Sequence, residues 1–356
     1  MRQIKRVRSA DGERSRGAGG AGGRGGVVLA FCFAAGLLAS GSAGATSASG
    51  PRLRVPVACE VGRTCFVQHY VDRDPGSGSR DFRCGTLTYD AHNGTDIRVP
   101  TLADQQQGVD VVAAADGEVL RVRDGAPDVS VREQGRERVR GTECGNAAII
   151  AHPGGLETQY CHMAKGSVTV RPGDRVRAGQ TIGRIGLSGE TEFPHLHFTV
   201  RRNGTVVDPF APEEGGSCGA GAPLWDEAAA KTLTYAPGVV LNAGFAPGPV
   251  TMEAIESGAA RRSGVTPAAP ALVAYVRAIG LQAGDVQRLA LTAPDGTVLA
   301  ENKAPPLDHH KAQWMMFAGL RRPAGGWRPG VYRATYAVER AGKAALEHGF
   351  TLDLKP

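Results

Sequence analysis

The strongest constraint on the fold of this chain is a series of short apolar runs separated by glycine-containing turns between residues 86 and 215. Runs at residues 109–114 and 118–122 flank one tight turn, and runs at residues 147–152 and 157–162 flank another. Short runs bounded by such turns are typical of strands, and each of these two pairs predicts a β-hairpin. We find no convincing amphipathic helix in this region. The pattern therefore predicts an all-β domain, either a sandwich or a barrel-like antiparallel sheet.

A second strand-rich region lies between residues 236 and 356, after a glycine-containing connector at residues 216–235. Alternation of apolar and polar residues at 272–277 and at 330–338 predicts strands in it. We expect a small C-terminal β-sandwich, immunoglobulin-like in broad architecture, to which the sequence assigns no role. Residues 46–85 precede the first region, and we expect them to form a disulfide-bearing lead-in packed against it.

The first 45 residues have the composition of a secretory signal. A basic segment leads into an apolar run at residues 27–39, and the small residues Ala43-Gly44-Ala45 then offer a cleavage site. The apolar run is too short and too rich in Gly and Ala for a comfortable membrane span. We therefore expect an exported protein, periplasmic or secreted, with no stable membrane span after cleavage. A retained N-terminal anchor is the alternative.

The net charge of +6 belongs mainly to this N-terminal segment. Seven of the 41 Lys and Arg residues and two of the 35 Asp and Glu residues lie in residues 1–45, so the remainder has a net charge of +1. A protein that binds nucleic acid usually carries a basic patch or stripe. The charge balance therefore gives no reason to expect a nucleic-acid partner.

Six cysteines lie beyond the predicted signal, and an even number in an exported chain favours disulfide bonds. Six cysteines allow 15 pairings, and the sequence does not fix one of them. Closeness in the chain and position around the second predicted hairpin favour one set. That set is Cys59 with Cys65, Cys144 with Cys161, and Cys84 with Cys218.

Two histidine-containing segments carry the chemistry. In the first, an extended backbone would place His92, Gly94 and Asp96 on one face, with Gly94 leaving room for a metal ion. In the second, His195 and His197 would share one face of a strand. The residues that alternate with this second pair, Leu196 and Phe198, would face the core.

His162, at the end of the second hairpin, completes a set of five candidate site residues. Each motif alone is weak, because a His-x-His pair on a strand is more often structural than metal-binding. Five of the nine histidines of the chain lie within residues 92–197, however, and a carboxylate lies among them. Two or three imidazoles with one carboxylate suit a catalytic zinc ion, in which three protein ligands leave the fourth position for water.

The order and spacing of these motifs resemble those of the lysostaphin and LytM-type zinc metallopeptidases. A His-x-x-x-Asp segment at residues 92–96 is followed by Tyr-x-His at residues 160–162. A Val-x-x-Gly-x-x-Val-x-x-Gly-Gln-x-Ile-Gly stretch at residues 170–183 and Pro-His-Leu-His-Phe at residues 194–198 complete the pattern. The resemblance covers about 130 residues and ends at the Val-Asp-Pro of residues 207–209.

The resemblance implies a zinc-dependent endopeptidase that cuts peptide bonds in bacterial peptidoglycan, with one Zn²⁺ per chain. His92, Asp96 and His197 would be the zinc ligands. His162 and His195 would lie beside the metal, orient the attacking water, transfer protons and stabilise the oxyanion. The scissile bond and the oligomeric state do not follow from it.

The chain departs from the family pattern before the last motif. Many relatives have small residues there, whereas this chain has Glu190, Glu192 and Phe193. We expect these three side chains to line or rim the cleft and to influence which charged groups of a stem peptide fit. A solvated loop is the plainer alternative. The insert at residues 125–143 lengthens another loop that could wall the groove.

Two alternative functions stay open. A catalytically inactive relative could bind peptidoglycan or activate an amidase, although such relatives typically lose ligands. A secreted protease could instead act on substrates outside the cell wall. Of the other histidines, His152 is expected to be a satisfied core residue, and His69 and His348 are expected to have no constellation of site residues around them.

Overall fold

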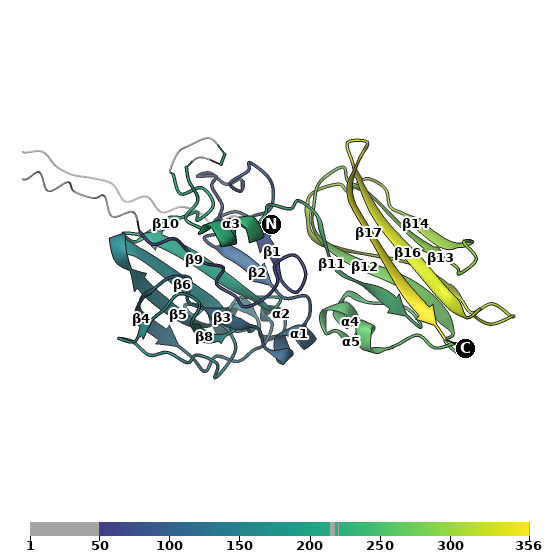
Figure 1. Ribbon diagram of the computed structural model, residues 1–356, viewed down its shortest axis with the longest axis horizontal. Coiled ribbons are helices and arrows are strands. Elements are labelled where there is room, and N and C mark those ends of the chain that lie inside the picture. The colour runs from purple at the N-terminus through teal and green to yellow at the C-terminus, as the bar shows by residue number, and fades with distance from the viewer. Residues whose placement is uncertain (1–49, 214–217, 220, 356) are drawn as a thin grey trace, which may run out of the picture. The chain divides into compact units, whose positions relative to one another are not determined.

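Antiparallel strands make up most of the computed structural model, which describes residues 50–213, 218–219 and 221–355 (Figure 1). The all-β class predicted from the sequence is confirmed. The predicted signal at residues 1–45 lies outside the described residues. Among the helices of the described part, none is long and apolar enough to cross a membrane.

The N-terminal half of the described chain contains one large sheet and one small one. Its strands are β1 (Phe66–His69), β2 (Thr95–Arg98), β3 (Asp110–Val112), β4 (Gly117–Arg123), β5 (Asn146–His152), β6 (Leu156–Met163), β7 (Arg175–Val176), β8 (Thr181–Arg184), β9 (His195–Arg202) and β10 (Thr205–Val207). The large sheet has the order β1-β2-β9-β6-β5-β4-β7, and β10 pairs with β9. Strands β3 and β8 form the small sheet.

Of the two predicted hairpins, one is confirmed and one is wrong. Strands β5 and β6 pair across a tight turn at Pro153–Gly155, as expected. Strands β3 and β4 do not pair with each other, although a turn separates them. The N–H of Ala113 donates to the carbonyl of Gln180, and the carbonyl of Ala113 accepts from the N–H of Gly179. The chain therefore stays paired with the segment before β8 after β3 ends, and it crosses to the large sheet before β4.

Short helical segments interrupt the strands of this half. They are α1 (Leu102–Gln107), α2 (Val131–Gln134) and a 3₁₀ turn at Arg136–Val139. Helix α1 buries none of its residues, so it has no apolar stripe for a sequence pattern to reveal. It is instead started by Thr101, whose side chain accepts a hydrogen bond from the N–H of Asp104.

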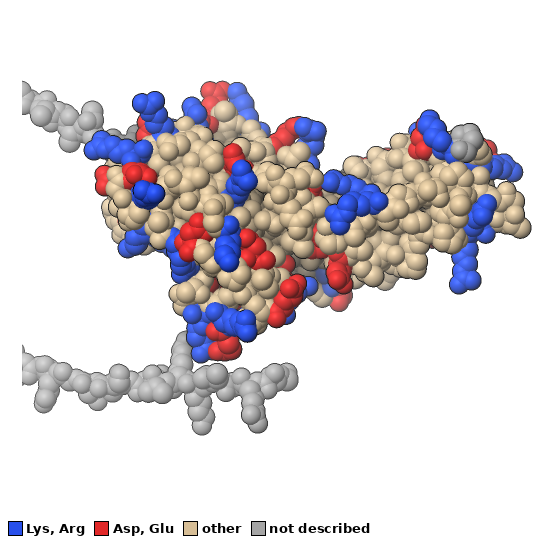
Figure 2. All heavy atoms as spheres, turned by 90° about the horizontal axis from the view of Figure 1, so that it is seen from below, with Lys and Arg blue, Asp and Glu red and all other residues tan. Residues whose placement is uncertain are grey.

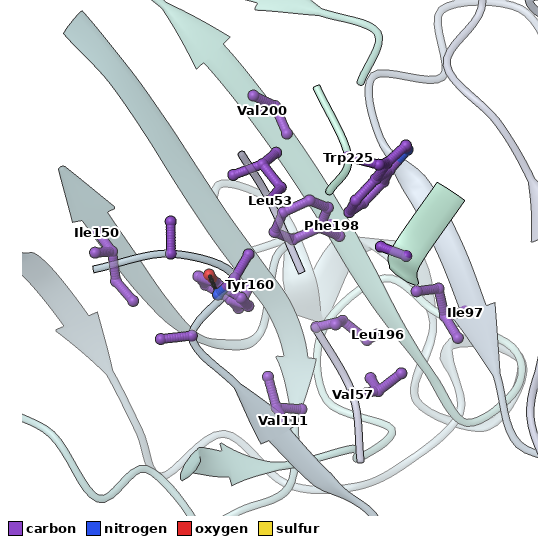
Figure 3. Close-up of a cluster of buried hydrophobic side chains, with 14 of the residues drawn as sticks. Leu53, Val57, Ile97, Val111, Ile150, Tyr160, Leu196, Phe198, Val200 and Trp225 are labelled. Atoms are coloured by element: carbon purple, nitrogen blue, oxygen red, sulfur yellow. Dashed lines mark hydrogen bonds between the residues drawn. The ribbon is translucent and has the colours of Figure 1, made fainter. Parts of the chain in front are cut away.

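Strand β9 separates the core from the opposite face of the large sheet. Leu196, Phe198 and Val200 are fully buried and point into a cluster with Leu53 and Trp225 (Figure 3). The alternation predicted for this strand is therefore confirmed on its apolar side. The intervening histidines lie on the other face of the sheet, where the candidate site is.

The segment before the site contributes to the same sheet. Strand β1 lies in the stretch of residues 46–85 that the sequence places ahead of the peptidase region, and it pairs with β2. Its register shifts between Val67 and His69, which marks a β-bulge. A bulge of this kind turns a side chain out of the regular alternation, and it does so here next to Asp96.

The three disulfide bonds favoured by the sequence are confirmed. They join Cys59 to Cys65, Cys84 to Cys218, and Cys144 to Cys161. The bond between Cys144 and Cys161 lies beside the predicted site residue His162, since Cys161 is its neighbour in the chain.

The C-terminal half is a β-sandwich, as predicted. Its elements are β11 (Val239–Ala246), α4 (Met252–Glu256), α5 (Ala259–Arg262), β12 (Ala271–Leu281), β13 (Val286–Thr292), β14 (Val298–Lys303), β15 (Lys311–Arg321), β16 (Gly330–Arg340) and β17 (Lys343–Leu354). Helix α3 (Glu227–Thr232) precedes them and buries Ala229 in the core of the N-terminal half. One sheet has the order β11-β12-β15 and the other β14-β13-β16-β17. Strand β12 is buried on both faces, because alternate residues pack between the sheets and against Ile255 and Ala260 of the short helices.

Charged side chains of both signs are mixed on the surface. On the face drawn in Figure 2, Lys and Arg side chains lie close to Asp and Glu side chains over much of the described chain. This mixture agrees with the small net charge of the chain beyond residue 45.

Asp208 gives the fold a pH-dependent component that we expect to be measurable. Burial raises the pKa of Asp208 to about 7, and Arg73, with its guanidinium nitrogen 3.9 Å from the carboxylate, offsets only part of this effect. Because the folded-state pKa lies above the unfolded value, the stabilising contribution is full at acid pH and is lost as the pH rises towards 7. We therefore expect the unfolding free energy of Asp208→Asn, relative to that of the wild type, to increase as the pH rises. The difference should grow from roughly 1 kcal/mol at pH 4.5 to roughly 4 kcal/mol at pH 8.

Urea unfolding of both proteins at several pH values measures this gain. Parallel stability profiles for the two proteins across that pH range would contradict the expected role of Asp208. The comparison depends on the change with pH and not on the absolute stability of either protein, so a constant cost of the substitution does not affect it.

Candidate metal centre

Three neighbouring strands carry four of the five predicted site residues, and the segment before one of them carries the fifth. In the order β2-β9-β6, Asp96 lies opposite His197, and His197 lies opposite Cys161, the residue before His162. His195 lies two residues before His197 on the same face of β9. The sequence placed His92 on one extended segment with Asp96. In the structure, His92 lies outside any strand, at the end of a turn that precedes β2, where its N–H donates to the carbonyl of Tyr89. The path of the chain through this turn still places the His92 ring beside the Asp96 carboxylate.

Three of these residues converge on one carboxylate oxygen. Asp96 Oδ1 lies 3.2 Å from His92 Nε2 and 2.9 Å from His197 Nδ1, and these two nitrogens are 3.2 Å apart. Their ligating atoms form a group within 4.8 Å of one another. His162, His195 and His197 form a second such group, which shares His197 with the first.

The outward nitrogen of each candidate ligand is fixed by an oxygen acceptor. His92 Nδ1 lies 2.6 Å from the carbonyl oxygen of Tyr70, to which only an N–H can donate. His197 Nε2 lies 2.9 Å from the side-chain oxygen of Asn93. With the proton on the outward nitrogen, the inward nitrogen of each ring keeps its lone pair. This is the tautomer that a metal ion requires.

The two remaining histidines are oriented in the same way. His162 donates from Nδ1 to the carbonyl oxygen of Ser188 at 2.8 Å, and His195 donates from Nδ1 to that of Phe193 at 3.0 Å. The rings of His162 and His195 lie 4.7 Å apart between centroids. Each therefore presents Nε2 as a proton acceptor next to the group formed by Asp96 and its neighbours.

A strained backbone holds His162 in place. Its φ of +62° is in the left-handed region, which non-glycine residues rarely adopt. The N–H of His162 donates to the carbonyl of Cys144 at 2.8 Å, and Cys144 is disulfide-bonded to Cys161. The surrounding contacts therefore stabilise the unfavourable conformation, as is common for functional residues.

The electrostatics of the group suit a bound cation. Burial by itself raises the pKa of Asp96, but the positive forms of His92 and His195 and hydrogen bonds from the neighbouring rings lower it well below its usual value. Burial, together with His195 and His197, lowers the pKa of His162 well below its usual value. Burial likewise lowers the pKa of His197. Burial alone would lower the pKa of His92 too, but the Asp96 carboxylate outweighs it and raises that pKa. An ionised carboxylate and neutral imidazoles are the forms that bind zinc, and by donor type and spacing the residues fit a zinc ion.

Comparison with known protein families finds a match for the part of the chain that contains the site. The sequence profile of peptidase family M23 matches residues 90–209. That range contains all five of these residues. Residues 90–209 are a peptidase family M23 domain. The resemblance to lysostaphin and LytM-type peptidases is therefore confirmed.

Individual relatives match over the same domain. The DD-carboxypeptidase/endopeptidase Mpg of Neisseria meningitidis is 33% identical over 123 residues, which are 34% of this chain and 23% of that protein. The peptidoglycan DD-endopeptidase ShyB of Vibrio cholerae is 32% identical over 117 residues, 33% of this chain and 22% of that protein. The chain thus spans about a quarter of the length of these curated relatives.

Among solved structures, a zinc-containing peptidase from Vibrio cholerae is similar at 29% sequence identity. The match has a TM-score of 0.26 and covers 41% of this chain and 39% of that one.

Within the M23 domain, Gly94 provides space for a ligand ring. A Cβ atom at this position would lie 2.5 Å from His197 Nε2 and 2.9 Å from the carbonyl oxygen of Phe198. The sequence suggested that Gly94 leaves room for a metal. In the structure, the room is filled by the imidazole of His197.

The predicted rim residues line a cavity of about 800 Å³ above the five site residues. Glu190 pairs with Arg136 at 3.2 Å, and Glu192 pairs with Arg132. Both arginines come from the insert at residues 125–143, which therefore forms one wall of the cavity. The acidic side chains thus do not present unpaired negative charge to the cavity.

Phe193 packs against a buried arginine and a site histidine. The guanidinium of Arg98 lies 4.3 Å from its ring centroid, and the His195 ring lies 4.7 Å away on a tilted plane. Since the carbonyl of Phe193 also accepts the Nδ1–H of His195, this residue orients a site histidine and not only the rim.

The other histidines gave one correct and one wrong prediction. His152 is a satisfied core residue, with the carbonyl of Asp116 and the hydroxyl of Thr158 each 2.8 Å from one of its ring nitrogens. The prediction that His69 has no site residues around it is wrong. Its Nδ1 lies 3.0 Å from Asp96 Oδ2. Nothing in its local sequence signals the contact, which depends on the pairing of β1 with β2.

Proposed function

We propose that this chain is an exported zinc-dependent endopeptidase that hydrolyses peptide bonds in the stem peptides or cross-links of peptidoglycan. The observation that carries the proposal is the convergence of three imidazole nitrogens, those of His92, His195 and His197, within 3.4 Å of Asp96 Oδ1. His162 lies beside them, in one group with His195 and His197. Membership of the domain in peptidase family M23 and the peptidoglycan endopeptidases among its relatives support the substrate class. Three disulfide bonds support export to an oxidising compartment.

His92, Asp96 and His197 would hold the zinc ion. When bound, zinc lowers the pKa of a coordinated water towards ~7 and polarises the scissile carbonyl. His92 and Asp96 are buried and His197 is half-buried, and the orientations of the two rings are set by Tyr70 and Asn93. The centre therefore needs little rearrangement to take up the metal.

His162 and His195 would carry the proton transfers. Because each donates from Nδ1 to a backbone carbonyl, only Nε2 is available to accept the proton of the attacking water. The same nitrogen, once protonated, can give that proton to the leaving amine. The protonated ring also stabilises the negative charge that develops on the carbonyl oxygen of the peptide.

The test measures zinc content and muropeptide release on one purified sample of residues 46–356, with His197→Ala as the matched variant. We expect one zinc per chain and metal-dependent release of peptides from cross-linked muropeptides, both lost in His197→Ala. The product masses would identify the bond that is cut.

The other outcomes separate the alternatives. A zinc-bound protein that releases no peptide from peptidoglycan, but does cut a glycine-rich protein substrate, would replace the wall substrate with a non-wall one. A protein without zinc and without cleavage would overturn the catalytic proposal in favour of a binding or amidase-activating role.

A further inference from the structure

The site residues share one arrangement. One polar atom of each side chain faces the centre of the group, and the polar atom on its opposite side is fixed by a hydrogen bond to a residue outside the group. Tyr70 holds His92, Asn93 holds His197, and each of the two proton-transfer histidines is held by a backbone carbonyl. Asp96 has the same arrangement. Its Oδ1 points towards the candidate ligands, and its Oδ2 accepts a hydrogen bond from His69 Nδ1 at 3.0 Å.

His69 reaches Asp96 because of the irregular pairing at the end of β1. The register places His69 opposite Asp96 directly after the β-bulge that follows Val67. In an unbroken β1, the bulge residue would be absent and the alternation would set position 69 on the other face of the sheet. The bulge therefore gives this histidine its direction.

The surroundings of His69 restrict the movement of its ring. Its side chain is 11% exposed. The ring edge meets the Tyr89 ring at a centroid distance of 5.2 Å and the His92 ring at 5.8 Å, both close to perpendicular. A ring held on two sides by aromatic neighbours loses little further freedom when it donates to Asp96.

We propose that His69 is a positioning residue of the metal centre: it holds Asp96 through Oδ2, so that the carboxylate offers a single oxygen, Oδ1, to the zinc ion. The inference rests on the proposed zinc site and deepens it. His69 lies upstream of residues 90–209, the part that matches the M23 family, so it adds a residue from outside the matched domain to the centre.

The physical reason is that the two oxygens of this buried carboxylate have different requirements: Oδ2 needs a hydrogen-bond donor, and Oδ1 must be positioned for the metal ion. Asp96 is 2% exposed, so an oxygen without a partner there has no water to compensate it. Without the His69 donor, Oδ2 loses its hydrogen-bond partner and the carboxylate is held only through Oδ1, so we expect both the position and the donor strength of Oδ1 to change. Loss of such outer hydrogen bonds to metal ligands typically lowers metal affinity by about 10- to 100-fold.

The experiment compares zinc affinity in three substitutions at this position, using competition with a chromogenic chelator. His69→Phe keeps a ring against Tyr89 but has no donor, and His69→Ala removes both. His69→Asn keeps an N–H donor near the place of Nδ1. His348→Ala, on β17, is the matched control for a histidine outside the site.

We expect zinc affinity to fall about 10- to 100-fold in His69→Phe and His69→Ala. His69→Asn should stay within about threefold of the wild type, and His348→Ala should not change. Cobalt-substituted protein provides a second readout. The visible absorption of Co²⁺ should shift in His69→Phe, because the coordination by Asp96 changes, and should be retained in His69→Asn.

Equal zinc affinity and equal cobalt spectra in His69→Phe and His69→Asn would overturn the proposal, and this comparison holds even if His69→Ala does not fold. Failure of the proposed function is distinguishable from this outcome. Dependence of zinc affinity on His69 in a protein that cuts no muropeptide would leave the positioning role standing and remove the peptidase function. Cleavage of muropeptides by a protein whose zinc affinity does not depend on His69 would support the peptidase function and overturn the positioning role.

Discussion

Asparagine in place of Asp96 is expected to leave the purified protein without stoichiometric zinc and to reduce peptide hydrolysis about 10³-fold or more. Asp96 supplies the carboxylate of the candidate ligand set, and its Oδ1 is the atom on which His92 and His197 converge. An amide has nearly the same shape but carries no charge and is a weak zinc ligand. The estimate follows from the several kcal/mol that a metal contributes to stabilising charge in the transition state.

Metal analysis and a muropeptide digest of the same preparation measure both effects. Asp90→Asn is a suitable control, because Asp90 lies in the turn just before the site and its side chain is exposed. The control should keep zinc and activity. An Asp96→Asn protein that retained both would show that the carboxylate is not a ligand and that the metal centre is assigned to the wrong group.

Alternation along a strand was sufficient to predict part of this site. His195 and His197 share one face of β9 because strand residues two apart point the same way, and Leu196 and Phe198 are fully buried for the same reason. The disulfide between Cys144 and Cys161 was also within reach, because the two residues flank a hairpin. These features depend on residues that are close in sequence, which is where a sequence pattern is informative.

Other parts depended on the order of strands in the sheet. His69 approaches Asp96 because β1 is the neighbour of β2 and because a bulge redirects its side chain. Strand order and bulges arise from packing between distant segments, and the local sequence around His69 does not encode them. The wrong hairpin between β3 and β4 has a similar cause, since Ala113 finds its partners in residues 179–180.

The orientation of the imidazoles was also beyond the sequence. The acceptors that fix His92 and His162 are the backbone carbonyls of Tyr70 and Ser188, and any residue at those positions offers a carbonyl. Sequence motifs therefore identify which side chains meet at the site. They do not identify which nitrogen of each ring faces the centre of the site and which is held by an acceptor.

Alanine at His162 or at His195 is expected to lower kcat by about 10²- to 10⁴-fold while zinc remains bound. Each ring is anchored through Nδ1, and its Nε2 faces the cavity beside the ligands. Removing either ring takes away a proton acceptor and the positive charge that stabilises the developing oxyanion. Asp96, His92 and His197 stay in place, so the zinc content should match that of the wild type.

This outcome decides between two metal sites that the geometry offers. The ligating atoms of His92, Asp96 and His197 lie within 4.8 Å of one another, but so do those of His162, His195 and His197. Zinc at the second group would be lost with either alanine substitution, whereas zinc at the first would not. The double variant adds a further test, because residues that act in one step have effects on kcat that are far from additive. We therefore expect the double variant to be only slightly slower than the slower single variant, with its zinc retained, because the carboxylate of Asp96 makes the first group the better cation site.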